Sequence, residues 1–308
     1  MASLKELRNR ISSVRSTRKI TQAMKMVAAA KLRRAQEQAE NARPYAQRMQ
    51  RMLAALSASV AGQPGVPKLL SGTGRDDTHL IVLCTSDRGL CGAFNSNLVK
   101  EAKRRADNLI GQGKNVSVLC VGRKGRDQLR RTHGRYIHPD SGEIGKQLNY
   151  DTARAIADNI TARFDDGEFD VCQLVYARFR SPIKQYVTTM QLVPFSATEE
   201  AAPGEELPED MRMDTGTVET GTGGSYDFEP EEAQILAELL PRNMATQIYR
   251  ALLENNAGEQ GSRMTAMDGA TRNADDVIED LTLTYNRTRQ AVITKELNEI
   301  VSAKEALQ

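Results

Sequence analysis

The two ends of the chain constrain the fold most, because each is patterned as a helix too long to fit inside a globular domain. Residues 3–60 and 231–308 both carry apolar residues at helical spacing. At about 1.5 Å per residue, such helices would measure about 87 Å and about 115 Å. The sequence therefore predicts that the two terminal helices wind together antiparallel into a rod, with the globular part beside its base.

The apolar seams of the two helices support this pairing, because their members are spaced three and four residues apart as in coiled coils. The first seam starts at Leu4, Leu7, Ile11 and Val14, then weakens and is expected to shift to Ile20, Met24 and Val27. The second seam runs almost without a break through Met264, Met267, Thr271, Ala274, Ile278, Leu281, Tyr285, Thr288 and Val292.

Capping residues and prolines predict where these helices start and bend. Ser3 followed by Glu6 is a capping-box pattern for the first helix. Pro44 is expected to kink that helix, and Pro241 to divide a short piece from the rest of the second one.

Charge is distributed unevenly, although the formal net charge is only +2. Residues 1–52 hold 13 Lys and Arg against three acids, whereas residues 231–308 hold eight against 13. The two ends are therefore suited either to attract each other or to face partners of opposite charge.

The middle of the chain predicts an α/β domain. A linker rich in Gly, Pro and Ser at 61–78 precedes residues 79–198, where short apolar runs alternate with helical patterns. This alternation favours a Rossmann-like domain with a mainly parallel sheet. Residues 199–230 follow as an acidic insertion, expected to be flexible because few of its residues are apolar. The domain boundaries are thus 1–60, 61–78, 79–198, 199–230 and 231–308.

No residue pattern indicates catalysis, a cofactor or a metal ion. The four cysteines have no metal-binding spacing, and Gly89 and Gly92 form GxxG rather than a dinucleotide fingerprint. No apolar run approaches the roughly 20 residues of a membrane helix, and the N-terminus has no apolar leader segment. We therefore expect no catalytic residues, no cofactor and no metal.

Three motifs resemble the gamma subunits of bacterial F-type ATP synthases. They lie at residues 20–31 (ITQAMKMVAAAK), 86–92 (SDRGLCG) and 285–299, where YNRTRQA leads into ITKELNE. The resemblance covers both terminal helices and the α/β domain. Two departures stand out: the closing motif has Ala303-Lys304 where the family usually has Gly-Ala, and the acidic insertion is longer. That insertion contains no Cys, so thiol gating is not expected.

The resemblance implies a non-catalytic rotor shaft that couples rotation of a proton-driven c-ring to conformational changes in the catalytic beta subunits and regulates ATPase activity and proton flow. The implied partners are three alpha and three beta subunits, delta, epsilon, the c-ring and a regulatory inhibitor protein, with no nucleic acid. The implied location is peripheral, on the cytoplasmic side of the bacterial inner membrane.

The resemblance also implies two sets of contact residues, which would otherwise be interpreted as solvated helix faces or core packing. The set facing the catch loops of beta is Arg289, Gln290 and Thr294. The set facing the acidic lever of beta is Met24, Lys25, Lys31, Arg33, Arg34, Arg88 and Cys91.

Two other classes of protein compete with this interpretation. An α/β enzyme using a nucleotide would need a glycine fingerprint and a titratable cluster, and neither is visible. A nucleic-acid-binding coiled coil could use the basic first helix, but the chain lacks aromatic platforms for bases.

Overall fold

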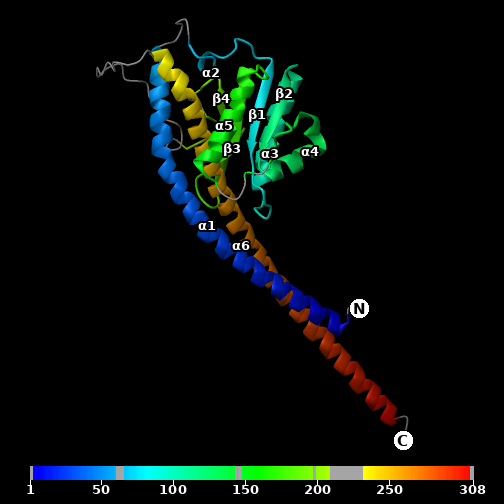
Figure 1. Cartoon of the computed structure of the whole chain (residues 1–308). Helices are drawn as coiled ribbons and strands as arrows, with labels where there is room; N and C mark the ends of the chain where they lie inside the picture. Colours follow the sequence, from blue (N-terminus) through cyan, green and yellow to red (C-terminus); the bar gives the residue numbers. More distant parts are fainter. Residues whose placement is uncertain are drawn as a thin grey trace. The chain divides into compact units, whose positions relative to one another are not determined.

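Two long helices begin and end the fold of this computed structural model, which describes residues 3–59, 66–142, 144, 148–196, 199–208 and 232–305. Helix α1 spans Leu4–Ser59 and helix α6 spans Glu232–Glu305. Both helices contribute to two compact units, one of Met1–Ala29 with Arg263–Gln308 and one of Ala30–Ser262. The predicted fold class, an α/β domain with long terminal helices, is confirmed (Figure 1).

The start of α1 is as predicted, whereas the break predicted in α6 is absent. The Ser3 hydroxyl accepts the backbone N–H of Glu6 at 3.2 Å and so caps the helix. Pro241 lies inside a continuous α6. Leu236 and Leu240 on either side of the lost hydrogen bond are buried against Leu53 of α1. This packing supports the helix where the proline weakens it.

A mixed five-stranded sheet forms the centre of the second unit, with the strand order β2-β1-β3-β4-β5. The strands are β1 (Thr78–Cys84), β2 (Asn115–Val121), β3 (Val171–Phe179), β4 (Gln185–Val193) and β5 (Glu199–Ala201). The β2–β1 and β1–β3 pairs are parallel, while β3–β4 and β4–β5 are antiparallel. The parallel prediction thus holds for the first three strands. The connection from β3 to β4 is too short for the crossover that a parallel pair needs.

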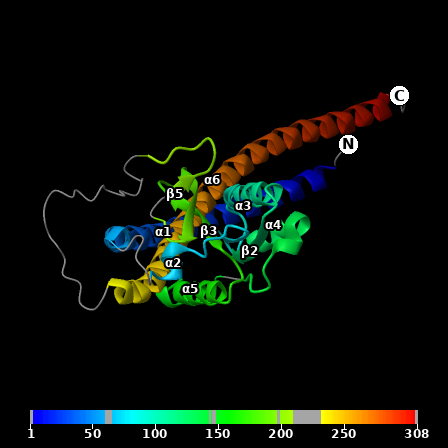
Figure 2. The same cartoon turned by 90° about the horizontal axis from the view of Figure 1, so that it is seen from above.

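Helices cover both faces of this sheet (Figure 2). The helices are α2 (Lys68–Ser71), α3 (Phe94–Gly111), α4 (Arg123–His133), the 3₁₀ helix η1 (Gly134–Tyr136) and α5 (Tyr150–Asp165). Helix α2 falls within the predicted linker, whose residues 61–65 lie outside the described part of the chain. Helix α4 has only one large apolar side chain buried, Leu129, and therefore too little apolar periodicity to be predicted.

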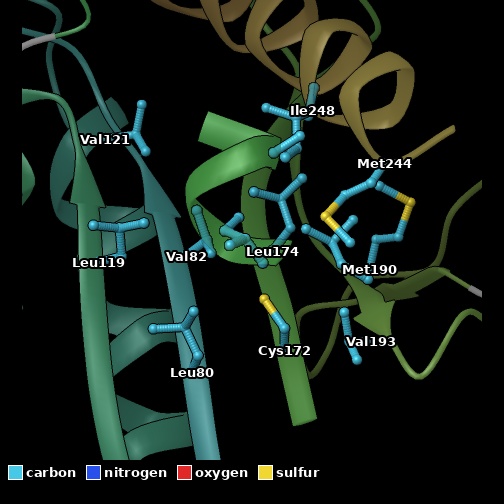
Figure 3. Close-up of a cluster of buried hydrophobic side chains, with 14 of the residues drawn as sticks. Leu80, Val82, Leu119, Val121, Cys172, Leu174, Met190, Val193, Met244 and Ile248 are labelled. Atoms are coloured by element: carbon cyan, nitrogen blue, oxygen red, sulfur yellow. The ribbon is translucent and has the colours of Figure 1, made fainter. Parts of the chain in front are cut away.

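Two cores form on the two faces of the sheet. One packs β1, β2 and β3 against α3 and Leu129 of α4. The other packs the opposite face against α5 and the first part of α6. In this second core, Met244 and Ile248 of α6 point toward Leu174 and Met190 of the sheet (Figure 3). Helix α6 is therefore an integral layer of the α/β domain.

The acidic stretch predicted to be flexible begins as part of the sheet. Glu199–Ala201 forms β5, and the Glu199 carboxylate is buried between the guanidinium groups of Arg178 and Arg250. The Tyr176 hydroxyl also donates to Glu199 at 2.8 Å. A buried carboxylate paired in this way holds its strand in place, so the insertion cannot start at residue 199. Residues 209–230 lie outside the described residues.

The glycines at the two ends of α4 provide a matched stability test. Gly122 has a φ of 112°, and a Cβ atom there would clash with the carbonyl group of Thr85. We expect Gly122→Ala to lower the free energy of unfolding by about 1–3 kcal/mol. Gly134 has helical φ and ψ with nothing near its Cβ position. Gly134→Ala should be neutral or stabilise by about 0.4–1 kcal/mol. Urea unfolding of the full chain measures both, and equal effects would contradict the argument.

Candidate subunit-contact site

The loop after β1 occupies the N-terminus of α4. The free amides at the N-terminus of a helix can hold an anion such as phosphate. Here the amide of Arg123 donates to the Asp87 carboxylate at 3.0 Å, and that of Lys124 to the Ser86 carbonyl at 3.0 Å. The amide of Gly125 donates to the hydroxyl of Thr85 at 2.8 Å. These three amides are therefore satisfied within the chain, so the N-terminus of α4 offers them to no anion.

The same loop presents Arg88 but buries Cys91. The Cys91 side chain is 2% exposed, and the Asn95 amide donates to its sulfur at 3.2 Å. Leu90, between them, has a φ of 64° and an exposed side chain. A direct contact through Cys91 would require this loop to open, because the sulfur is enclosed within the loop beside Asn95. Arg88 is exposed in the same conformation.

In the first unit, residues 3–29 of α1 pair antiparallel with α6 from Arg263 to the region of Tyr285. The seam of α6 follows the predicted spacing, with Met267 and Ala274 buried and Val292 at its end exposed. The α1 seam differs from the predicted one, because Ile20 and Val27 are 60% and 56% exposed. It continues instead at the original three-and-four spacing, through residues Leu4, Leu7, Ile11, Val14, Arg18, Thr21, Lys25 and Ala28.

Polar contacts replace apolar ones in the middle of this α1 seam. The contacting positions on α6 descend as those on α1 ascend, as an antiparallel pair requires. The pairs are Arg18–Asp275 at 2.5 Å, Thr21–Thr271 at 2.8 Å and Lys25–Asp268 at 2.6 Å.

The basic and acidic ends of the chain thus attract each other within this unit, and Lys25 is engaged there. The Lys25 ammonium, followed by the guanidinium of Arg272, holds the pKa of the Asp268 carboxyl below its usual range. Both partners are half-exposed, so the pair contributes little to stability and mainly fixes which residues face each other. Met24, next to Lys25, is only partly buried.

The end of α6 carries the predicted catch residues on an exposed helix. Arg8 of α1 donates to the Tyr285 hydroxyl at 2.9 Å, and this contact, more than the charge of Arg289, lowers the pKa of Tyr285. Residues 291–302 are exposed on every side, and this end runs on past the N-terminus of α1 (Figure 1). Arg289, Gln290 and Thr294 are all exposed at or beside this end. Apolar side chains are exposed there as well: Val292, Ile293, Leu297, Ile300 and Val301.

The remaining predicted lever residues belong to the second unit. Lys31, Arg33 and Arg34 are exposed on α1, and Arg33 pairs with Glu37 one turn away at 3.4 Å. They share this unit with Arg88 and Cys91, while Met24 and Lys25 belong to the first unit. The structure therefore divides the predicted lever set between the two units.

Within the described residues, no group of His, Cys, Asp or Glu side chains could hold a metal ion. The four cysteines, all within the described residues, are buried and form no disulfide. In the same part of the chain, no helix is long and apolar enough to cross a membrane.

Sequence reasoning missed the buried ion pairs of the second unit. Glu254 and Arg250 of α6 are buried among Ala251, Leu252 and Leu253. The sequence does contain a signal for these ion pairs: an Arg and a Glu lie one helical turn apart inside an apolar run. Because buried charges need partners, this pattern could have indicated them.

An α/β domain, together with an antiparallel pair of long helices whose C-terminal end is exposed on every side, is the architecture of a stalk protein that acts through contacts with other subunits. Comparison with known proteins agrees. The ATP synthase family profile matches residues 3–307. The ATP synthase gamma chains of Paramagnetospirillum magneticum and Paracoccus denitrificans are 55% and 56% identical to this chain, and both alignments cover each chain completely.

Solved structures give the same result. The central stalk of Tetrahymena thermophila mitochondrial ATP synthase is 29% identical, with a TM-score of 0.55, over 82% of this chain and 99% of that chain. The rotor of Euglena gracilis mitochondrial ATP synthase, 17% identical with a TM-score of 0.59, covers 94% and 98% and supports the fold. The chain belongs to the ATP synthase gamma chain family and is a non-catalytic central-stalk subunit.

Two isoleucines on α1 test the corrected seam. Ile11 is 8% exposed and Ile20 is 60% exposed, although both stand in the same helix. We expect Ile11→Ala to destabilise the helix pair by about 2–4 kcal/mol, because it leaves a cavity in the seam. Ile20→Ala should change stability by less than about 0.5 kcal/mol. Amide hydrogen exchange of residues 3–29 in the isolated full chain measures this difference. Faster exchange in the Ile20 variant than in the Ile11 variant would contradict the corrected seam and support the predicted one through Ile20 and Val27.

Proposed function

We propose that this chain is the rotating shaft that couples a membrane c-ring to the catalytic beta subunits, and that it thereby regulates ATPase activity and proton flow. The observation that carries this proposal is the end of α6, where residues 291–302 are exposed on every side and include large apolar side chains. Apolar surface of this kind is stable in water only when partners surround it. A ring of subunits around a rod would cover all of its faces at once.

The asymmetry of the rod supports the mechanical part of the proposal. Two helices of different sequence present a different surface in each direction. Each of three identical beta subunits around the rod would therefore meet a different face and favour a different conformation. Rotation would move these faces from one beta subunit to the next, which is a population shift driven by differential contact.

The proposed partners are three alpha and three beta subunits around the rod, with delta, epsilon and the c-ring completing the complex, and a regulatory inhibitor protein. Support comes from the solved relatives, whose descriptions include a central stalk with a c-ring and an assembly of OSCP, F1 and c-ring. Attachment through such a ring would place the chain at the cytoplasmic side of the bacterial inner membrane as a peripheral protein.

Contact with beta is assigned to exposed residues of both units. Arg289, Gln290 and Thr294 are proposed to bind the catch loops, because a guanidinium group can hold a carboxylate through two parallel hydrogen bonds. The acidic lever is proposed to face Met24 and the exposed basic groups Lys31, Arg33, Arg34 and Arg88. Lys25 would act there through its ion pair with Asp268, and Cys91 through the loop that it holds.

The catch residues can be tested against a neighbouring arginine in the reconstituted complex. We expect the double change Arg289→Ala with Gln290→Ala to lower ATP turnover per assembled complex by roughly tenfold, a loss of about 1.4 kcal/mol in contacts that favour the productive state. Arg287→Ala removes the same charge two residues away, from a side chain that is also exposed. It should leave turnover nearly unchanged.

Turnover is measured as ATP hydrolysis per complex, with assembly quantified by native gel electrophoresis. Unchanged turnover in the double variant, or an equal loss in Arg287→Ala, would refute the catch assignment. Complexes that form without this chain and still couple ATP hydrolysis to rotation of the c-ring would refute the shaft function itself.

A further inference from the structure

The end of β3 is paired with β4 on one edge and uses α6 for hydrogen bonds on the other. Strand β1 pairs with β3 only as far as Val175, while β3 continues to Phe179. Beyond β1, two backbone amides of β3 are satisfied by side chains of α6. The Asn255 amide oxygen accepts the N–H of Ala177 at 3.2 Å, and the Glu254 carboxylate accepts the N–H of Phe179 at 2.9 Å.

Helix α1 joins the same contact through Arg43. Its guanidinium group donates to both oxygens of Glu254, at 2.7 and 3.0 Å, which is the bidentate geometry of a strong ion pair. The same Arg43 donates to the carbonyl oxygen of Phe179 at 3.0 Å. Arg43, Glu254 and the backbone of Phe179 therefore form one contact between α1, α6 and β3, which we call the Glu254 clamp.

The close approach of α6 to the sheet makes this clamp possible. A Cβ atom at Gly258 would lie 3.0 Å from the ring of Phe94, and one at Gly261 would lie 3.0 Å from Pro182. Both glycines therefore let the helix backbone lie against the sheet where β3 ends. With the spacing set by the glycines, the charged groups of the clamp set the orientation of the helices.

The chemistry of the clamp favours positioning over simple packing. The side chain of Glu254 is fully buried, and burying a carboxylate is costly unless its partners satisfy it. An apolar side chain would pack at this place without that cost, but it could accept no hydrogen bond from the N–H of Phe179 and could not orient Arg43 toward the carbonyl oxygen of Phe179. A charged pair with fixed geometry specifies one arrangement of α1 relative to α6 and the strand.

We propose that Glu254 is a positioning residue for torque transfer, which locks both helices to the end of β3 so that they turn with the α/β domain as one body. The inference rests on the proposed shaft function. Both helices continue along the chain from this unit into the other, α1 through Ala29 and α6 through Arg263. Without the clamp, each helix could twist separately against the sheet, and part of the rotation would be absorbed there.

The contact itself is tested in the isolated full chain by amide hydrogen exchange. Glu254→Gln keeps the shape of the side chain but removes its charge. We expect the amide of Phe179 to exchange about ten- to a hundredfold faster in this variant, because a charge-assisted hydrogen bond is lost. The amide of Val175, which lies where β1 still pairs, serves as the internal control. Unchanged exchange at Phe179 would overturn the clamp.

The positioning role is tested in the complete complex by single-molecule rotation, with the hexamer fixed and a probe on the α/β domain. We expect the angular variance of the probe during catalytic pauses to widen in Glu254→Gln and in Arg43→Met. The angular variance of the double variant should be no larger than that of either single variant, because each of the three variants removes the same contact. Arg242→Ala, which removes an exposed ion pair with Glu238 on α6, should match the wild type.

These results separate the clamp from a merely structural role and from the shaft function. If assembled complexes of both single variants show the same angular variance of the probe as the wild type, torque transfer through the clamp is overturned. This holds even if the melting temperature of the variants falls. Absence of rotation in the wild-type complex would overturn both this inference and the proposed function.

Discussion

The pairing of α1 with α6 is the constraint on which the rest of the structure depends, because most of the stability of a helix comes from packing its apolar side against a partner. The antiparallel contacts in the first unit consist of small and apolar residues interrupted by Arg18, Thr21 and Lys25. Such polar contacts add little stability, yet they specify which residue faces which. With a purely apolar seam, one helix could slide past the other by one turn at little cost. Here such a shift would separate each polar residue from its partner on the other helix.

The sequence predicted the long helices well, because a spacing of three and four residues repeated over many turns is typical of paired helices and rare in any other structure. It predicted the seam of α1 less well. Ile20 and Val27 are apolar and close to the expected spacing, so the sequence predicted them as seam residues. In the structure both are exposed. The true seam keeps its spacing by accepting charged residues, and hydrophobicity alone cannot reveal a position whose burial depends on an ion pair with the other end of the chain.

The candidate site likewise could be predicted where neighbouring residues determine the structure, but not where residues distant in the sequence do. The contact residues on α6 came from a family resemblance, since an exposed Arg289 or Gln290 looks like any solvated helix face. Cys91 came with them, although the fold buries its sulfur beside Asn95. Helix α4 escaped prediction because only Leu129 among its large apolar side chains is buried. Glu254 escaped because its partners, Arg43 and Phe179, are far away in sequence and only the folded sheet brings them together.

The loop that fills the N-terminus of α4 also ties two strand ends together. A helix N-terminus with free amides attracts anions such as phosphate. In this chain, Thr85, Ser86 and Asp87 already occupy the amides that would receive it. An anion could reach this end of α4 only by displacing those oxygens. The same bonds join the segments that follow β1 and β2, so the carboxyl ends of two neighbouring strands are held by a single set of hydrogen bonds.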